Sequence, residues 1–224
     1  MTSPDEILAE LVERSRALGR DRSLVVFGGG NTSVKATVED HLGRPQRIMW
    51  VKGSGSDLVS ATVDDFPALR LDDIDPLREW EAMDDDEMIG LVSRALLDPA
   101  AKRPSIETLL HAFLPFRHID HVHADAVCAL TNHPHGREAV AEALGEGFAY
   151  VEWKRSGFEL SKMVGELADS DGVVLAQHGL ITWGDTSDES LARTLEVVGK
   201  CEDYVAAKRL ERAVAPTTCP DVAP

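Results

Sequence analysis

The 224-residue chain is 43% hydrophobic and 28% charged, a balance that fits a soluble globular protein and not a disordered one. Its formal net charge of −16, from 39 acidic against 23 basic residues, argues against a surface for nucleic acid or anionic membranes, because both need clustered lysine and arginine. The three cysteines form no Cys-x-x-Cys pair, which favours a reducing compartment. The sequence has no apolar run of the roughly 18 residues that span a membrane and no signal-peptide core, so a cytoplasmic setting is expected.

The first third of the chain predicts one helix and three strands. Ser3, Pro4 and Glu6 give a helix-start signal, in which Ser3 is the N-cap and Glu6 completes a capping box. An apolar stripe follows, and Gly19 is expected to end this helix. Short apolar runs predict strands at residues 24–27, 47–52 and 68–71, the first of them buried.

Two glycine-rich turns follow the first two strands. Gly28-Gly29-Gly30-Asn31-Thr32-Ser33 is close to a dinucleotide-binding fingerprint, but Ser33 stands at the third glycine position and the residues after it alternate as in a strand. We therefore expect a strand-turn-strand loop whose backbone N–H groups line an anion or hydroxyl site. The second turn, Gly53-Ser54-Gly55-Ser56-Asp57, follows Lys52. Its donors suit a phosphate monoester, and a plain hairpin turn is an equally good interpretation of these residues.

The central stretch, residues 104–125, concentrates side chains that bind metals. A helix predicted over 105–113 puts Glu107 and His111 on one face. In the strand predicted over 118–123, alternation puts His121 and His123 on one face, from which both imidazoles can reach one ion at ~2.0–2.1 Å. This pattern predicts a divalent metal bound by histidine with an acid/base carboxylate beside it.

Other histidines compete for the ligand role. His133 and His135 lie in a turn with Pro134 and Gly136, where imidazoles are usually solvated, so the pair on the strand is favoured. For His111 and His118, packing or support is favoured over ligation. Asp120 is a candidate to hold an imidazole in one tautomer, and a surface role is an equal alternative.

The last half of the chain predicts alternating helices and strands. His178 follows the buried apolar strand 172–176 and precedes Gly179, a position where site residues occur in many α/β folds. The tail, 213–224, has three prolines and is expected to be loose. The other expected elements are helices at 86–97, 124–131, 137–144, 158–167 and 185–210 and strands at 150–153 and 181–183.

Taken together, these residues resemble the class II aldolase/adducin family of metal-dependent sugar-phosphate enzymes, from about residue 20 to 210. The matching motifs, in the family's order, are Gly30-Asn31-Thr32-Ser33, Gly53-Ser54-Gly55, Pro104-Ser105-Ile106-Glu107, His121-Val122-His123 and Gln177-His178-Gly179. The two glycine turns resemble those of the aldolase half of rhamnulose-phosphate aldolase/short-chain dehydrogenase proteins. The dehydrogenase half is not in this sequence, so we expect a stand-alone relative.

The resemblance implies an α/β protein with a three-layer α/β/α fold and a mostly antiparallel central sheet. It implies a single domain over residues 1–224 and a homotetramer with active sites at subunit interfaces. It also implies a lyase that cleaves a ketose 1-phosphate of the rhamnulose/fuculose-phosphate type to dihydroxyacetone phosphate and an aldehyde through a metal-stabilised enediolate.

The resemblance assigns a role to each matching residue. Glu107 would be the general acid/base that moves the proton at the carbon next to the carbonyl. The implied ligands of Zn²⁺, or of another divalent ion such as Mn²⁺, are His121, His123 and His178. The implied phosphate-binding residues are Asn31, Ser54, Gly55 and Ser105.

Two departures from the family's pattern keep other activities open. Ile106 stands where phosphate-binding relatives often have a second serine, and the only tyrosines available as proton donors are Tyr150 and Tyr204. The alternatives on the same metal site are an epimerase, a dehydratase of the methylthioribulose-phosphate type and a keto-acid decarboxylase. A non-catalytic binding protein like the adducin head is a further alternative.

Overall fold

The computed structural model describes residues 3–214, with side chains described up to residue 209. A seven-stranded sheet runs through the molecule in the order β3-β2-β1-β4-β7-β6-β5. The strands are β1 (Asn31–Glu39), β2 (Pro45–Val51), β3 (Ala68–Arg70), β4 (His118–Val122), β5 (Phe148–Val151), β6 (Gly172–Leu175) and β7 (Gly179–Gly184). Five strand pairs are antiparallel and one, β5 with β6, is parallel, so the sheet is mixed and mostly antiparallel, as expected.

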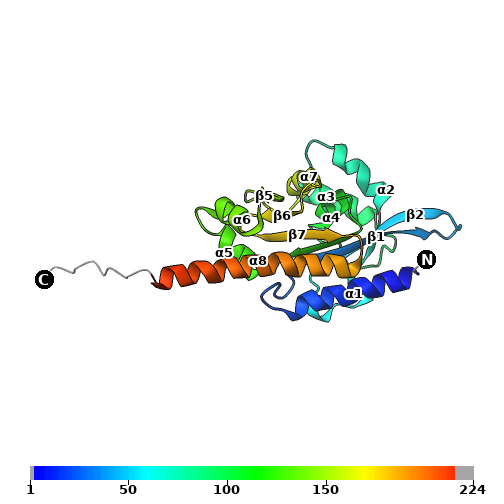
Figure 1. Ribbon diagram of the computed structural model, residues 1–224. Coiled ribbons are helices and arrows are strands. Elements are labelled where there is room, and N and C mark those ends of the chain that lie inside the picture. The colour runs from blue at the N-terminus through cyan, green and yellow to red at the C-terminus, as the bar shows by residue number, and fades with distance from the viewer. Residues whose placement is uncertain (1–2, 215–224) are drawn as a thin grey trace.

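Helices cover both faces of the sheet and make the predicted three layers (Figure 1). The helices are α1 (Pro4–Arg20), α2 (Leu71–Ile74), α3 (Asp85–Arg94), α4 (Thr108–Phe113), α5 (Asp125–Thr131), α6 (Gly136–Leu144), α7 (Phe158–Gly165) and α8 (Ser187–Val214). Short 3₁₀ turns are η1 (Leu58–Ser60), η2 (Val63–Asp65) and η3 (Asp75–Glu79). Helices α1 and α8 lie on one face, α2, α3, α4 and α7 on the other, and α8 projects past the sheet beside α5 and α6.

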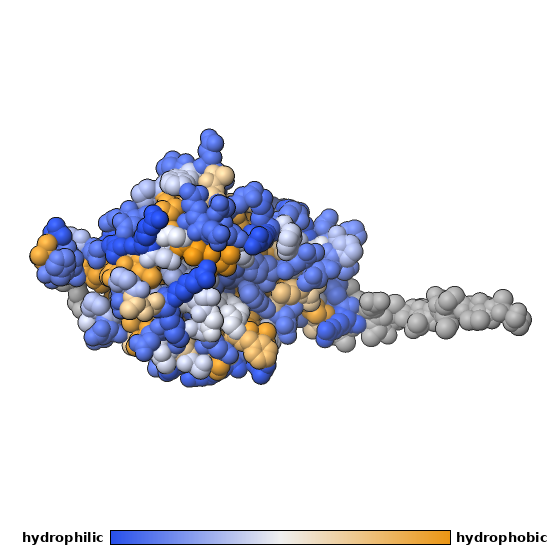
Figure 2. All heavy atoms as spheres, turned by 180° about the vertical axis from the view of Figure 1, so that it is seen from behind, coloured by the Kyte–Doolittle hydropathy of each residue, from blue (hydrophilic) through white to orange (hydrophobic). Residues whose placement is uncertain are grey.

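Strand β2 shows how the core is divided between the two faces. Ile48 and Trp50 belong to the apolar cluster under α1, whereas Met49 and Val51 belong to the cluster under α3 and α4. Because successive side chains of a strand point to opposite faces, a continuous apolar run is buried on both sides. No helix among residues 3–214 is long and apolar enough to cross a membrane, and the face in Figure 2 is largely hydrophilic with small separate apolar patches.

The strand predicted at residues 24–27 is wrong. Leu24 and Val25 are buried, but their N–H groups bond to the Asp21 carbonyl in a turn, and Val26 and Phe27 are 46% and 72% exposed. A short apolar run has no periodicity that separates a strand from a buried turn. The other predicted strands and helices are present, with ends shifted by a few residues.

The C-terminal ends of α1 and α8 also differ from the predicted ends. Helix α1 continues through Gly19 to Arg20, and a Cβ at Gly19 would lie 2.3 Å from the Val59 nitrogen, so this glycine permits close packing on η1. Helix α8 continues to Val214 and takes in the first two residues of the expected tail, 213–224. The remainder of that tail lies outside the described residues.

A buried polar network ties α1, β4 and α8 together. Arg14 Nε donates to Asp120 Oδ1 at 2.8 Å, and Arg14 Nη1 lies 2.7 Å from His118 Nδ1. Asp120 Oδ2 accepts from Ser190 Oγ at 2.7 Å. Asp120 is therefore occupied in holding the layers together and does not contact an imidazole of the site, while His118 has the expected supporting role.

Because of His118, we expect this network to make the folded chain less stable in acid. An arginine only donates, so His118 Nδ1 accepts and the ring is neutral. Burial, and then Arg14 and Arg117, lower the pKa of His118 to about 3. Between about pH 6.5 and 3 the unfolded chain binds the proton and the folded chain does not, so the free energy of unfolding falls as pH falls.

His118→Gln, which keeps an acceptor for Arg14, should flatten this slope by up to about 1.4 kcal/mol per pH unit. Urea titrations with chelator present, repeated from neutral to acidic pH, measure it. The matched control is His41→Gln, at an exposed histidine, which should leave the slope unchanged. Equal slopes for His118→Gln and the unmodified chain would contradict the neutral assignment.

Candidate metal centre

Three imidazoles and one carboxylate converge at the end of β4. His121 Nε2 lies 3.0 Å from His123 Nε2 and 3.3 Å from His178 Nε2. His178 lies on the turn between β6 and β7. Glu107, the N-cap residue of α4, places Oε1 3.1 Å from His178 Nε2 and 3.6 Å from His121 Nε2. One ligand atom from each of these four residues lies within 4.8 Å of all the others.

The arrangement fits a divalent metal. His121 Nδ1 donates to the Leu180 carbonyl at 3.1 Å, which leaves Nε2 to face the other two rings, with a lone pair whenever the ring is neutral. Facing lone pairs at 3.0 and 3.3 Å repel unless a cation or a proton lies between them. A tetrahedral ion with bonds of ~2.0–2.1 Å separates its nitrogen ligands by ~3.3 Å, which is close to these distances.

Strand pairing and glycines position the three rings. Antiparallel pairing of β4 with β7 sets Val122 against Leu180, which brings the turn with His178 to the end of β4. A Cβ at Gly29 would lie 3.0 Å from His123 Nδ1, and a Cβ at Gly179 would lie 2.2 Å from the Val122 carbonyl. The glycines beside the histidines therefore make room for the rings and for the turn.

Helix α4 is anchored at the end opposite Glu107. Lys35 Nζ donates to the Ala112 carbonyl at 3.1 Å, and Arg78 Nη2 donates to the Phe113 carbonyl at 2.6 Å. These groups satisfy carbonyls that have no partner within the helix, and the Arg78 guanidinium favours its negative end. The helix is thereby fixed with Glu107 facing the imidazoles.

The electrostatics keep Glu107 ionised. Burial would raise the pKa of the Glu107 carboxyl, but attraction and hydrogen bonds from His121 and His178 hold it well below its usual value. Burial, followed by repulsion from His121 and His178, lowers the pKa of His123 to about 3. A neutral imidazole and an ionised carboxylate are the forms that bind metals.

Asn31 and Ser105, predicted to bind phosphate, lie beside Glu107. Asn31 Nδ2 donates to Glu107 Oε2 at 2.6 Å and to Ser105 Oγ at 3.3 Å. The amide group is thus turned toward the carboxylate, and Asn31 Oδ1 is buried without a partner among the described residues. Ser156 Oγ, from the segment between β5 and α7, donates to Glu107 Oε1 at 3.1 Å.

The second glycine turn carries the other two predicted phosphate-binding residues. Ser54 and Gly55 lie exposed at its tip, and Gly55 has φ of +78°, a conformation that favours glycine. Lys52 is 2% exposed, and its Nζ donates to the Gly28 carbonyl at 3.0 Å and the Ser56 carbonyl at 2.7 Å. Lys52 therefore joins the two glycine turns to each other.

The remaining histidines lie outside the cluster. His111 Nδ1 lies 2.8 Å from Ser33 Oγ in the core, which is the expected packing role. His133 and His135 form their own contact in a turn, with ring centroids 5.6 Å apart. Tyr150 packs against α6 with the Arg137 guanidinium over its ring at 4.6 Å.

A family model described as Class II Aldolase and Adducin N-terminal domain matches residues 9–205. The chain belongs to this family. It is 43% identical over 200 residues to "Uncharacterized oxidoreductase YuxG" of Bacillus subtilis (strain 168), covering 88% of this chain and 29% of that protein. The chain thus spans less than a third of the length of this relative.

Solved structures agree with the family assignment. The N-terminal class II aldolase domain of a conserved protein from Thermoplasma acidophilum is 37% identical with a TM-score of 0.85, over 92% of this chain and 96% of that one. A sugar-phosphate aldolase from Thermotoga maritima is 17% identical with a TM-score of 0.71, over 92% and 96%. An L-fuculose-1-phosphate aldolase from Thermus thermophilus is 18% identical with a TM-score of 0.61, over 92% and 99%. At these two lower identities the likeness shows the fold alone.

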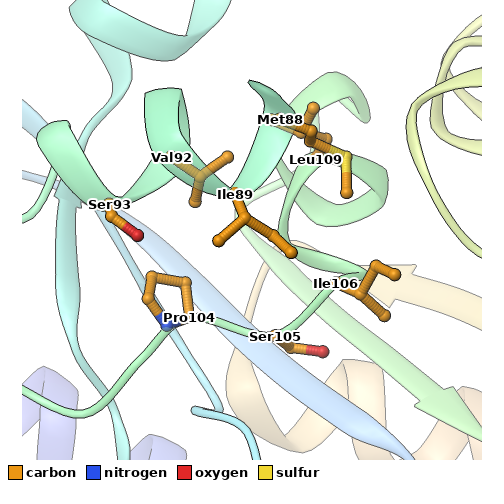
Figure 3. Close-up of a pocket in the computed structure, with 8 residues that line it drawn as sticks. All are labelled: Met88, Ile89, Val92, Ser93, Pro104, Ser105, Ile106 and Leu109. Carbon is orange, nitrogen blue, oxygen red and sulfur yellow. The ribbon is translucent and has the colours of Figure 1, made fainter. Parts of the chain in front are cut away.

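One departure from the class II aldolase pattern is visible beside Ser105. Ile106 is 36% exposed and lies next to a small apolar hollow between α3 and α4, whose volume is about 10 Å³ (Figure 3). This is the space of about one water molecule, so the hollow takes no substrate group. Ile106 therefore places an apolar side chain at the edge of this hollow, where it offers no hydroxyl donor.

Sequence reasoning missed Ser156 as a site residue and Lys52 as a link between turns. Nothing around Ser156 in Arg155-Ser156-Gly157 signals a site, because its partner Glu107 is 49 residues away. Lys52 carried a usable signal, since it is a lone cation between a buried strand and a glycine turn. Its burial lowers its pKa.

Proposed function

We propose that the chain is a divalent-metal-dependent aldolase that cleaves a ketose 1-phosphate of the rhamnulose/fuculose-phosphate type to dihydroxyacetone phosphate and an aldehyde. The observation that carries the proposal is the convergence of three imidazole Nε2 atoms with a buried, ionised carboxylate. Three protein nitrogens with an open side are typical of catalytic metal sites, whereas structural sites are closed by four protein ligands.

The proposed roles follow from the contacts. His121, His123 and His178 hold Zn²⁺, or another ion such as Mn²⁺, and the bound ion supplies Lewis-acid polarisation of the substrate's carbonyl and hydroxyl oxygens. Breaking the C–C bond releases the hydroxyl proton of the new aldehyde, and Glu107, after taking up a proton, delivers it to the carbon next to the carbonyl of dihydroxyacetone phosphate. Asn31 holds the Glu107 carboxylate with its amide, and Ser105 accepts from that amide.

The phosphate group is assigned to the two glycine turns. Ser54 and Gly55 are exposed at the tip of the second turn, and the hydroxyl of Ser105 follows the isolated bridge that pairs Gly53 with Pro104. Lys52 adds a buried positive charge that attracts the Glu107 carboxylate. Backbone N–H groups, hydroxyls and one cation are suitable donors for a phosphate monoester.

The proposal includes a cytoplasmic homotetramer with sites at subunit interfaces. Two exposed aromatic residues support a subunit contact near the site: Phe27, 72% exposed, precedes the first glycine turn, and Trp153, 63% exposed, precedes Ser156. Large exposed aromatic side chains are enriched at protein interfaces. The free thiols of Cys128 and Cys201 fit a reducing compartment.

A second candidate function uses the same centre on a substrate without phosphate. Ile106 contributes no hydroxyl, and the Asn31 amide already donates to Glu107, which reduces the donors left for a phosphate. Epimerisation, dehydration and keto-acid decarboxylation need the same polarised carbonyl. A solved relative, YgbL from Klebsiella pneumoniae, is described as a putative aldolase/epimerase/decarboxylase.

A substrate panel tests both candidates. Purified protein is expected to contain a divalent ion and to release dihydroxyacetone phosphate from a ketose 1-phosphate, measured by coupled reduction with NADH. Chelation should abolish the release, and Zn²⁺ or Mn²⁺ should restore it. A protein that contains no divalent ion and releases no dihydroxyacetone phosphate would refute the proposal of an enzyme. Products formed only from unphosphorylated ketoses or keto acids would favour the second candidate function over the first.

A further inference from the structure

The Glu107 carboxylate is held on both oxygens by segments far apart in the sequence. Asn31 Nδ2, at the start of β1, donates to Oε2 at 2.6 Å, and Ser156 Oγ donates to Oε1 at 3.1 Å. Oε1 is also the oxygen that faces His178 and His121. Ser156 therefore donates to Oε1, the carboxylate oxygen that faces the imidazoles of the metal cluster.

The segment that carries Ser156 is fixed on both sides of it. Arg155 Nη2 binds Asp85 Oδ2 at 2.7 Å at the start of α3. On the other side, the Gly157 carbonyl accepts from Ser161 Oγ at 2.8 Å, and Phe158 is buried with its ring edge-on to Phe113 of α4. These contacts tie the segment to α3 and to the helix that bears Glu107, so the serine is held in place over the carboxylate.

The Ser156 hydroxyl is not used to begin α7. Serine commonly caps a helix, but the N-cap of α7 is Gly157, with φ of +150° and no side-chain cap bond. The hydroxyl instead reaches Glu107. A donor to one carboxylate oxygen fixes the rotation of the group, and such outer partners of metal-site residues set the orientation of the residues they hold.

We propose that Ser156 is a positioning residue for Glu107. The Ser156 hydroxyl holds Glu107 Oε1 toward the three imidazoles and so sets the affinity of the cluster for a divalent ion. The inference rests on the proposed function only in that the cluster binds a metal. It adds a residue of the segment between β5 and α7 to a site otherwise built from the glycine turns, α4, β4 and the turn before β7.

A double-mutant cycle on metal affinity tests the inference, with Co²⁺ as the probe and calorimetry as the measurement. Ser156→Ala should weaken Co²⁺ binding about 10-fold in the unmodified chain. In a Glu107→Ala background the same change should alter it by less than about twofold, since the residue acts through the carboxylate. Ser156→Thr keeps a hydroxyl and should retain the affinity. Ser60→Ala, at an exposed serine of η1, is the matched control.

The outcomes separate this inference from the aldolase proposal. An equal loss in both backgrounds, or no loss from Ser156→Ala, overturns the positioning role. Coupled losses without release of dihydroxyacetone phosphate from any ketose phosphate refute the aldolase and leave the positioning role standing. A chain that binds no Co²⁺ overturns both.

Discussion

His121→Ala is expected to abolish metal binding. The His121 ring is fully buried, and its Nε2 lies within 3.3 Å of the nitrogens of both His123 and His178, so it is the central ligand of the three. Its removal leaves two imidazoles for the ion. Loss of an outer partner of a ligand already costs about 10–100-fold in affinity, and loss of the ligand itself should exceed about 100-fold. Elemental analysis and Zn²⁺ calorimetry measure the result.

Two variants make the His121 experiment specific. His135→Ala removes an exposed imidazole outside the cluster and should retain the full metal content. Circular dichroism and the urea midpoint of His121→Ala separate a loss of ligand from a loss of fold, since a buried ring is being deleted. A folded His121→Ala protein with the metal content of the unmodified chain would remove these histidines as ligands.

Local patterns account for the paired histidines and for most of the elements. Period-two alternation predicts that His121 and His123 share a face, and their ring centroids lie 4.8 Å apart, although β4 ends at Val122. The strand predicted for β2 is present because its apolar run is packed on both sides by helices. Such features depend on neighbours in the sequence, and a sequence displays them directly.

Features that depend on strand pairing could not be derived locally. His178 reaches the cluster because β7 pairs with β4, and only the family resemblance placed it there beforehand. Asn31 is predicted to bind phosphate, and the sequence gives no sign that its pairing opposite His121 also sets its amide nitrogen against Glu107. Ser156 joins the same carboxylate from a segment with no motif. Hydrogen bonds between distant segments leave no periodic signal in the chain.

With saturating divalent ion, which the three histidines still bind, Glu107→Gln is expected to lower kcat by about 10²–10⁴-fold, because general acid–base catalysis contributes about this factor. Glutamine matches the size of glutamate and keeps an oxygen that accepts from Asn31 or Ser156, but its amide does not exchange a proton at carbon. KM should change little, since the histidines and glycine turns remain. Initial rates of dihydroxyacetone phosphate release and elemental analysis of the same preparation give the two values. Glu152→Gln, at an exposed glutamate paired with Arg137, is the control.

The metal content of Glu107→Gln decides what the carboxylate does. Its Oε1 lies 3.1 Å from His178 Nε2, close enough to serve either as a ligand or as a base beside the ion. Retained metal with a lost rate assigns Glu107 to proton transfer. Metal lost together with rate would make Glu107 a fourth ligand, and the proton step would then need another group. Because His121→Ala must lose metal in either case, the pair of variants separates holding the ion from moving the proton.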